Sequence, residues 1–346
     1  MSEVLRVLNW GANIGPQTVA NFEIETGSKV DYETYGSIEE LEGRVFSARA
    51  DCDIVFAAST TSNRMIAANL LQPLDKTALS NIDNLSAPIL EKLRRFDPDG
   101  SYLVPYLWGS IGLIYNPAIV DEVVPGADMS DLATLFNPVS MEKLAPRGVA
   151  LFDSPNEAIA LALNYLGRDP YSDHAGHMAE AQALFAAIRP HIRYFDTLKL
   201  IAGLASGDIG VALSYSGVAG IAKHAAQDAG PRNAGKTNAF RYAIPKQGTL
   251  VWIDNMSIPA KSKNPSGAHR FIDYMLRPDV IADVTNAVFY ANANAAASPY
   301  VNPDILNDPN FYPPPELVAR LYSEKTLDEG LKRQRSELWE AMKSGG

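Results

Sequence analysis

Residues 53–62 read Asp53-Ile54-Val55-Phe56-Ala57-Ala58-Ser59-Thr60-Thr61-Ser62, an apolar run that ends in four consecutive hydroxyl side chains. Residues 53–57 have the composition of a buried strand. Residues 5–8 predict another short strand, and Thr18–Thr26 has helical spacing that ends at Gly27. Strands and helices alternate along the first hundred residues, and this alternation predicts an α/β fold with a mostly parallel sheet.

In sheets of this kind, ligands bind beyond the carboxyl ends of the strands. Trp10, Thr60 and Trp108 each follow a predicted strand. The stretch Val251-Trp252-Ile253-Asp254-Asn255 adds a carboxylate beside a large aromatic ring. This pair suits an organic ammonium group, because the carboxylate accepts its N–H bonds and the ring attracts the cation by about 0.5–2 kcal/mol. The alternative for this stretch is a buried tryptophan and a surface aspartate at a strand end.

Composition narrows the class of protein. The chain has 346 residues, 47% of them hydrophobic, so it can bury a large core, and its length favours two domains. A formal net charge of −10 makes nucleic acid and anionic membranes poor partners. The single cysteine, Cys52, excludes an internal disulfide and a Cys-based zinc site. No run of 18 apolar residues predicts a membrane span.

One segment matches a nucleotide-binding pattern letter for letter. Residues 230–237 read Gly-Pro-Arg-Asn-Ala-Gly-Lys-Thr, which fits G-x-x-x-x-G-K-[ST]. That motif needs a strand before it and a helix after it, whereas here residues 221–229 are helical and residues 238–244 alternate like a strand. We interpret the segment as a polar surface loop.

Two other patterns are weaker. The spacing of His174, His177 and Glu180 would suit a metal ion, but their polar context favours a solvated helix start. The serines of interest, Ser154, Ser214 and Ser216, have no convincing histidine partner in the sequence, so the sequence supports no catalytic triad.

Longer stretches of the chain resemble the periplasmic polyamine-binding proteins, the receptors of ATP-driven spermidine and putrescine importers. The resemblance is carried by residues 8–10, 18–23, 41–43, 71–76, 105–108, 163–167, 192–195, 274–280 and 289–294. It implies the two-lobed α/β fold of periplasmic solute-binding proteins, with a hinge between the lobes and the ligand cleft at their interface. We expect lobe 1 to comprise residues 1–108 and 240–294, and lobe 2 to comprise residues 109–239 and 295–346, with residues 102–116 crossing between them.

The resemblance also implies which residues bind the ligand. The family's aromatic box falls on Trp10, Tyr215, Trp252 and Tyr290, its acids on Glu157 and Asp254, and its hydroxyl on Thr60. Glu324 falls where spermidine binders have a glutamine at the far end of the ligand. Gly11 and Asn13, which follow Trp10 in the same turn, are added to these residues. The expected contacts are Trp10, Gly11, Asn13, Thr60, Glu157, Tyr215, Trp252, Asp254, Tyr290 and Glu324.

The chain departs from the putrescine pattern at two positions. Ala12 and Val218 stand where putrescine binders have carboxylates. A buried ammonium without a counter-charge costs several kcal/mol, so the ligand's second positive end needs another partner. Either Glu324 or water serves that end, or the ligand is a monocationic or zwitterionic amine.

The resulting expectation is a periplasmic binding protein that delivers a small cationic amine to an ABC permease in the inner membrane. It would act as a monomer without a cofactor, as a mature chain whose signal peptide has been removed, and would not be an enzyme. Two alternatives remain: an enzyme that uses the cleft acids, and a relative that has lost amine binding and serves as a sensor or interaction module.

Overall fold

The computed structural model describes residues 4–47, 50–228, 240–318 and 320–344. The chain forms two compact units. Unit 1 contains Met1–Gly109 and Trp252–Tyr312, and unit 2 contains Ser110–Val251 and Pro313–Gly346. The predicted phosphate-loop pattern at residues 230–237 lies outside the described residues.

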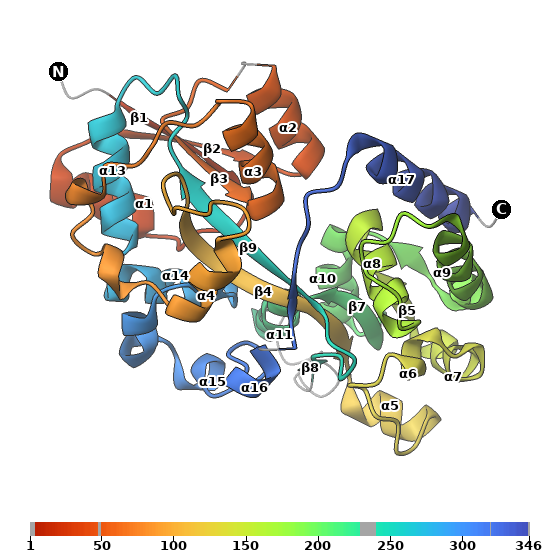
Figure 1. Cartoon of the computed structure of the whole chain (residues 1–346). Coiled ribbons are helices and arrows are strands. Elements are labelled where there is room, and N and C mark those ends of the chain that lie inside the picture. Colours follow the sequence, from red (N-terminus) through yellow and green to blue (C-terminus); the bar gives the residue numbers. More distant parts are fainter. Residues whose placement is uncertain (1–3, 48–49, 229–239, 319, 345–346) are drawn as a thin grey trace. The chain divides into compact units, whose positions relative to one another are not determined.

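Unit 1 is built around a sheet with helices on both of its faces (Figure 1). Its strands are β1 (Leu5–Trp10), β2 (Val30–Tyr35), β3 (Ile54–Ala58), β10 (Ala291–Asn292) and parts of β4 (Val104–Tyr115) and β9 (Leu250–Ser257). Its α-helices are α1 (Thr18–Thr26), α2 (Ile38–Phe46), α3 (Ser59–Ala67), α4 (Ala87–Leu93), α13 (Pro265–Met275), α14 (Pro278–Val288) and α15 (Pro303–Leu306). The strand predicted at residues 53–57 and the helix predicted at Thr18–Thr26 are confirmed as β3 and α1.

The order of the strands in unit 1 determines which face of the sheet each helix covers. The parallel strands are arranged β2-β1-β3, and β9 joins β3 antiparallel. The chain moves from β1 to β2 in one direction and from β2 to β3 in the other. Right-handed crossovers therefore place α1 and α2 on opposite faces of the sheet. The point where the direction reverses lies between the carboxyl ends of β1 and β3, which is where such sheets bind ligands.

Unit 2 has its own sheet. Its strands are β5 (Val149–Leu151), β6 (Tyr194–Phe195), β7 (Val211–Tyr215), β8 (Arg241–Ala243), β11 (Tyr322–Ser323) and the remaining parts of β4 and β9. Its α-helices are α5 (Pro117–Val123), α6 (Ala133–Phe136), α7 (Pro138–Leu144), α8 (Pro155–Tyr165), α9 (Ala175–Ile188), α10 (Thr197–Ser206), α11 (Ser216–Asp228), α16 (Pro315–Val318) and α17 (Glu329–Ser344).

The parallel strands of unit 2 repeat the topology of unit 1. They are arranged β6-β5-β7, so the first strand in the chain again lies in the middle. The direction of the connections reverses between β5 and β7. The residues that follow β5 and β7 therefore occupy in unit 2 the place that the residues after β1 and β3 occupy in unit 1.

The units differ from the expected lobe boundaries in two places. Residues 240–251 belong to unit 2, because β8 pairs with the second half of β4 and the residues Leu250 and Val251 pair with β11. Residues 295–312 belong to unit 1, where the Tyr312 hydroxyl lies 3.2 Å from the Asn292 backbone N–H and accepts its hydrogen bond. The last 30 residues are also less helical than expected, since β11 precedes α17.

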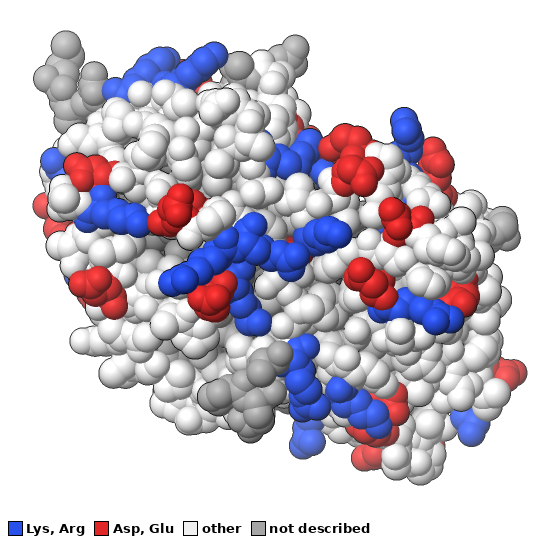
Figure 2. Space-filling model, viewed as in Figure 1, with Lys and Arg blue, Asp and Glu red and all other residues white. Residues whose placement is uncertain are grey.

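The charged surface mixes both signs. Figure 2 shows Lys and Arg side chains interspersed with Asp and Glu on the face in view. Within unit 1, Arg277 pairs with Glu25 and Asp279 at 2.8 Å, and within unit 2, Arg168 pairs with Glu180 at 2.8 Å. Exposed pairs of this kind contribute about 0–1 kcal/mol each, so the fold depends on its buried contacts instead.

Gly148, directly before β5, tests how tightly the sheet of unit 2 is packed. Its φ is +79°, and an added Cβ would overlap the Asp208 carbonyl oxygen. Gly167 has a similar φ of +71° with no atom within 4 Å of an added Cβ. Gly167→Ala should therefore lower the free energy of unfolding by about 1–2 kcal/mol through backbone strain alone. Gly148→Ala should lower it by roughly a further 1–3 kcal/mol through overpacking. Urea unfolding of the two variants measures the difference, and equal losses would contradict the close contact.

Candidate functional site

The predicted residues of unit 1 gather where β1 and β3 end. Trp10 is the last residue of β1, and Thr60 lies half-buried in the first turn of α3, two residues after β3. Because β9 runs antiparallel to β3, Asp254 pairs with Ala58 and is carried to the same edge of the sheet. Trp252, two residues before Asp254, shares a face of the strand with it. Three separate segments thus bring their side chains to one ligand-binding position of the sheet.

Asp254 is a buried carboxyl group. It is 7% exposed, and its Oδ2 lies 3.4 Å from the Asn13 amide nitrogen, which donates to it. Burial raises the pKa of Asp254 to about 7, and the N–H groups of Trp10 and Asn13 offset part of that rise. The Trp10 indole nitrogen is buried and makes no geometrically complete hydrogen bond within the described residues. The aspartate expected at a surface in the alternative interpretation is therefore buried, and only the N–H groups of Trp10 and Asn13 favour its charged form.

The turn after β1 holds Asn13 in place. The Asn13 carbonyl accepts hydrogen bonds from the Tyr106 hydroxyl at 2.8 Å and from the Asn9 amide at 3.3 Å. Ala12 adopts the left-handed conformation, with φ at +58°. The Gly11 backbone N–H donates to the Tyr35 carbonyl at 3.0 Å, which ties the turn to β2. Asn13 thus contacts Asp254, and Gly11 lies two residues before Asn13 in the same turn. Ala12, which stands where putrescine binders have a carboxylate, is the residue with the left-handed conformation.

Two aromatic pairs accompany the carboxylate. The rings of Trp252 and Tyr290 meet edge to face, with centroids 5.0 Å apart, and those of Trp10 and Tyr35 are 4.4 Å apart. Burial raises the pKa of Tyr290, and the nearby Asp254 charge raises it further. Three of the four predicted box residues therefore lie in unit 1 with Asp254. Trp108 serves the core instead, since its indole N–H donates to the Asn292 carbonyl at 3.0 Å.

The predicted residues of unit 2 lie at the corresponding reversal in their own sheet. Glu157 is in the first turn of α8 after β5, and Tyr215 ends β7. The Tyr215 hydroxyl donates to the Glu157 carboxylate at 3.5 Å, and the Ser154 hydroxyl donates to its other oxygen. Ser154 directly precedes α8, and its hydroxyl binds Glu157 and does not cap the helix. Tyr215 also packs edge to face on Phe152, with ring centroids 5.2 Å apart.

Glu324, directly after β11, is half-buried near Tyr171. Burial raises the pKa of the Tyr171 phenol, and the charges of Glu324 and Glu157 raise it further. Both acids therefore act on one phenol, whose hydroxyl donates to the Ser323 carbonyl at 2.9 Å. Val218, the position of the second missing acid, is 3% exposed on α11. It is a packing residue, so a carboxylate there would be buried.

The sequence analysis missed several residues that support these groups. Tyr35 and Tyr106 lie near Asp254, because the Asp254 charge raises the pKa of both phenols after the larger effect of burial. In unit 2, Tyr171 and Arg335 were missed. A tyrosine inside an ordinary strand carries no signal of its role in the sequence. The position of Tyr35 beside Trp10 could be found only from the register of β1 and β2, in which the two residues pair.

The two histidines of the suggested metal spacing have other contacts in the structure. Among the described residues, no group of three or more His, Cys, Asp or Glu side chains is placed to hold a metal ion. His174 begins α9, accepting the Gly176 N–H, and His177 contacts Ser172 at 2.8 Å. Searched over the described residues, the helices include none long and apolar enough to cross a membrane.

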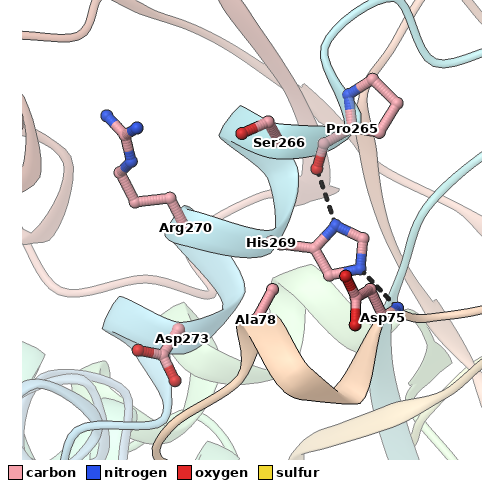
Figure 3. A pocket seen from close by; sticks show the side chains of 7 residues that line it. All are labelled: Asp75, Ala78, Pro265, Ser266, His269, Arg270 and Asp273. Carbon is pink, nitrogen blue, oxygen red and sulfur yellow. Dashed lines mark hydrogen bonds between the residues drawn. The ribbon is translucent and has the colours of Figure 1, made fainter.

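A surface pocket in unit 1 shares no residue with the predicted site. It is lined by Asp75, Ala78, Pro265, Ser266, His269, Arg270 and Asp273 (Figure 3). The His269 ring accepts the Asp75 backbone N–H at 2.8 Å, so its other nitrogen carries the proton and donates to the Pro265 carbonyl at 2.7 Å. This histidine joins α13 to the distant segment that contains Asp75, which is a structural role.

The chain is similar along most of its length to known solute-binding proteins. Residues 17–313 match the family model described as bacterial extracellular solute-binding protein, and the chain belongs to that family. The putrescine-binding periplasmic protein PotF of Escherichia coli (strain K12) is 38% identical over 99% of this chain and 92% of its own length. The putrescine-binding periplasmic protein SpuD of Pseudomonas aeruginosa is 36% identical over 99% and 93%.

A solved structure extends the similarity to the fold. The spermidine/putrescine ABC transporter substrate-binding protein PotD of Streptococcus pneumoniae superposes with a TM-score of 0.83 at 26% identity, covering 99% of both chains. The expected two-domain α/β fold of solute-binding proteins is confirmed.

The raised pKa of Asp254 predicts an unusual stability profile for the ligand-free protein. A carboxyl whose pKa is raised in the folded state contributes stability that is complete below pH 4 and is lost as the pH rises through about 7. At pH 8 the buried charge should lower the free energy of unfolding by roughly 2–4 kcal/mol. Asp254→Asn should therefore raise the melting temperature of the ligand-free protein at pH 8 and change it less at pH 5.

Asp53 provides the matched control for that experiment. It is also buried, at 2% exposed, but its carboxylate accepts hydrogen bonds at 2.8–2.9 Å from the backbone N–H groups of Arg6, Lys263 and Asn264 and from the Ser262 hydroxyl. Asp53→Asn should lower the melting temperature at both pH values. A loss of stability in Asp254→Asn at pH 8 would show that the Asp254 charge is satisfied without ligand.

Proposed function

We propose that the protein captures a polyamine-class organic amine outside the cytoplasm and delivers it to the permease of an ABC importer. The observation that carries the proposal is Asp254, a carboxylate that is 7% exposed and has no Lys, Arg or His partner among the described residues. An ammonium group is the partner that this site lacks. The Trp252 and Tyr290 rings supply the aromatic surface that attracts such a cation.

The names of the relatives support the polyamine class and the transport role. PotF and SpuD are named putrescine-binding periplasmic proteins, and the structural relative is named as an ABC transporter substrate-binding protein. We extend the periplasmic location and the role in ABC transport to this chain, with a permease as its partner. We further propose that it acts as a monomer and does not turn its ligand over. The two-domain fold of the family supports binding by a shift from an open to a closed population.

The proposed contacts are the residues that the resemblance selected. In unit 1 they are Trp10, Gly11, Asn13, Thr60, Trp252, Asp254 and Tyr290, and in unit 2 they are Glu157, Tyr215 and Glu324. The hydrogen bond from Tyr215 to Glu157 and the shared effect of Glu157 and Glu324 on Tyr171 support a second acidic position. A ligand with an amine at each end would use both positions.

Calorimetric titration with putrescine at pH 8 and pH 6 tests the proposal. Putrescine keeps its charge at both values, whereas Asp254, with a pKa of about 7, is mostly ionised at pH 8 and mostly protonated at pH 6. The affinity should therefore fall about tenfold between pH 8 and pH 6. Asp254→Asn should weaken binding at pH 8 by roughly 2–5 kcal/mol and remove the pH dependence.

Asp53→Asn again serves as the control, because it alters a buried carboxylate of unit 1 that the proposal leaves out. Its affinity for putrescine should match that of the unaltered protein. No heat with any amine of a panel that includes putrescine, spermidine and agmatine would refute the proposed function. Turnover of an amine would instead indicate an enzyme.

The alternative of a monocationic or zwitterionic ligand rests on Ala12, which offers no charge at the exposed turn after β1. Asp and Asn adopt the left-handed conformation of this position more readily than Ala does. Ala12→Asp should therefore fold normally and raise putrescine affinity at least tenfold, or about 1.4 kcal/mol.

Ala12→Asn is the matched control for Ala12→Asp, since it has the same shape and backbone preference without the charge. We expect it to change putrescine affinity less than about threefold, or 0.7 kcal/mol. An equal gain in the two variants would assign the effect to the backbone. Tight putrescine binding by the unaltered protein with no gain in Ala12→Asp would show that another group already serves the second ammonium.

A further inference from the structure

Arg335 is a fully buried cation in unit 2. It lies on α17, is 0% exposed, and is among the largest fully buried side chains of the described residues. Its guanidinium donates to the backbone carbonyls of Asn156 at 3.1 Å and Pro170 at 2.7 Å. Its Nε atom has no hydrogen-bond partner within the described part of the chain. No carboxylate there forms an ion pair with it, so the charge is only partly satisfied.

The position of Arg335 is fixed by its helix. Trp339, one turn further along α17, donates its indole N–H to the Asp153 carboxylate at 2.7 Å. Residues four apart share one face of a helix, so α17 holds the residues just before and just after the start of α8. Glu157 lies in that first turn of α8, directly after Asn156. The buried cation therefore lies beneath the acid that was selected for ligand binding.

Electrostatics connects Arg335 to both acids of unit 2. Burial lowers the pKa of Arg335, and attraction to the Tyr171 phenol and to the Glu157 carboxylate opposes that change. The same Tyr171 feels the charges of Glu157 and Glu324, and the Arg335 charge opposes them. The Arg335 guanidinium also lies 6.0 Å from the centre of the Tyr171 ring. The charges of two carboxylates and one guanidinium thus act on one phenol, and the guanidinium lies over its ring.

We propose that Arg335 is a specificity-determining residue that limits how much positive charge unit 2 accepts from a bound amine. This inference rests on the proposed function and concerns the same ligand. The two acids carry two negative charges, and Arg335 cancels one of them. Glu157, Glu324 and Arg335 together therefore carry one net negative charge, which balances a single ammonium group. A ligand that brings two positive centres to unit 2 is left with one of them unmatched in a partly buried place, where charge is costly.

Arg335 acts on the ligand through Glu157 and Glu324, since a fully buried side chain does not touch it. Its role is therefore seen in the preference between amines of different charge. Putrescine, with two ammonium groups, and spermidine, with three, provide the comparison. Arg335→Gln should increase the ratio of spermidine affinity to putrescine affinity at least tenfold, because the variant removes one positive charge from beside the two acids and the more highly charged amine gains more from that change.

A charge-balance series makes the test independent of the stability of one variant. Glu324→Gln, with Arg335 intact, should lower the same ratio at least threefold. The double variant Arg335→Gln with Glu324→Gln restores one net negative charge and should return the ratio to within about threefold of the unaltered protein. Arg335→Lys keeps the charge and should leave the ratio within the same limit.

Arg189 provides a matched structural control. Its guanidinium also donates to a backbone carbonyl of α17, that of Lys343, at 2.8 and 3.0 Å, and it lies 5.4 Å from the centre of the Phe195 ring. Arg189→Gln removes similar hydrogen bonds to a backbone carbonyl at a half-buried position, and no described contact joins Arg189 to Glu157 or Glu324, so its ratio should stay unchanged. Circular dichroism and melting temperature report whether each variant is folded.

Each outcome decides the inference. An equal change in the affinities for both amines in Arg335→Gln, or the same shift of the ratio in Arg189→Gln, would assign Arg335 a structural role only. If Arg335→Gln does not fold, an unchanged ratio in Glu324→Gln overturns the inference. If the unaltered protein binds putrescine and Arg335→Gln leaves the ratio of spermidine to putrescine affinity unchanged, only the role of Arg335 is refuted. If the unaltered protein binds neither amine, the proposed function is refuted as well.

Discussion

The structure depends first on the right-handed connection between parallel strands. In each unit the first of three parallel strands lies in the middle, with the second strand on one side of it and the third on the other. With a fixed hand, the helices must cover opposite faces, and the chain must leave an opening where its direction reverses. In unit 1, Trp10 ends one of the two strands beside that point and Thr60 follows the other. In unit 2, Tyr215 ends one and Glu157 follows the other. One topological constraint thus places functional side chains twice in a chain that has no repeat in its sequence.

The second constraint is the energy of buried charge. Asp254 and Arg335 are both buried, and neither has an ion-pair partner among the described residues. The two buried charges differ in the hydrogen bonds that offset the cost of their burial. Arg335 donates to two carbonyls and faces a phenol, whereas Asp254 accepts one long hydrogen bond from Asn13. The unit that holds Asp254 is therefore less stable without a cation than it would be with a neutral residue there. This is the compromise expected where a protein keeps a site ready for a ligand.

Much of the site could be predicted because its residues stand at strand ends or carry a family pattern. The strand before Thr60 and the pair Trp252 and Asp254 were evident from apolar runs followed by polar residues. Arg335 was not, because it lies in a helix rich in Lys, Arg and Glu, where a buried arginine and a solvated one look alike in sequence. The burial of Val218 was equally hidden: the family pattern marked the position as lacking a carboxylate, and only the structure shows that the side chain is packed on α11.

The sequence by itself determined the alternation of strands and helices, the α/β class and the residue types of the site, because periodicity and turn chemistry are local properties. Only the tertiary structure decided the rest. The burial of Asp254 depends on β9 pairing with β3, whose residues are about 200 positions away in the chain. The cancelling charge of Arg335 depends on α17 returning to α8, across 179 positions. Energies of burial and charge arise from contacts between distant segments, and no local pattern records which segments will meet.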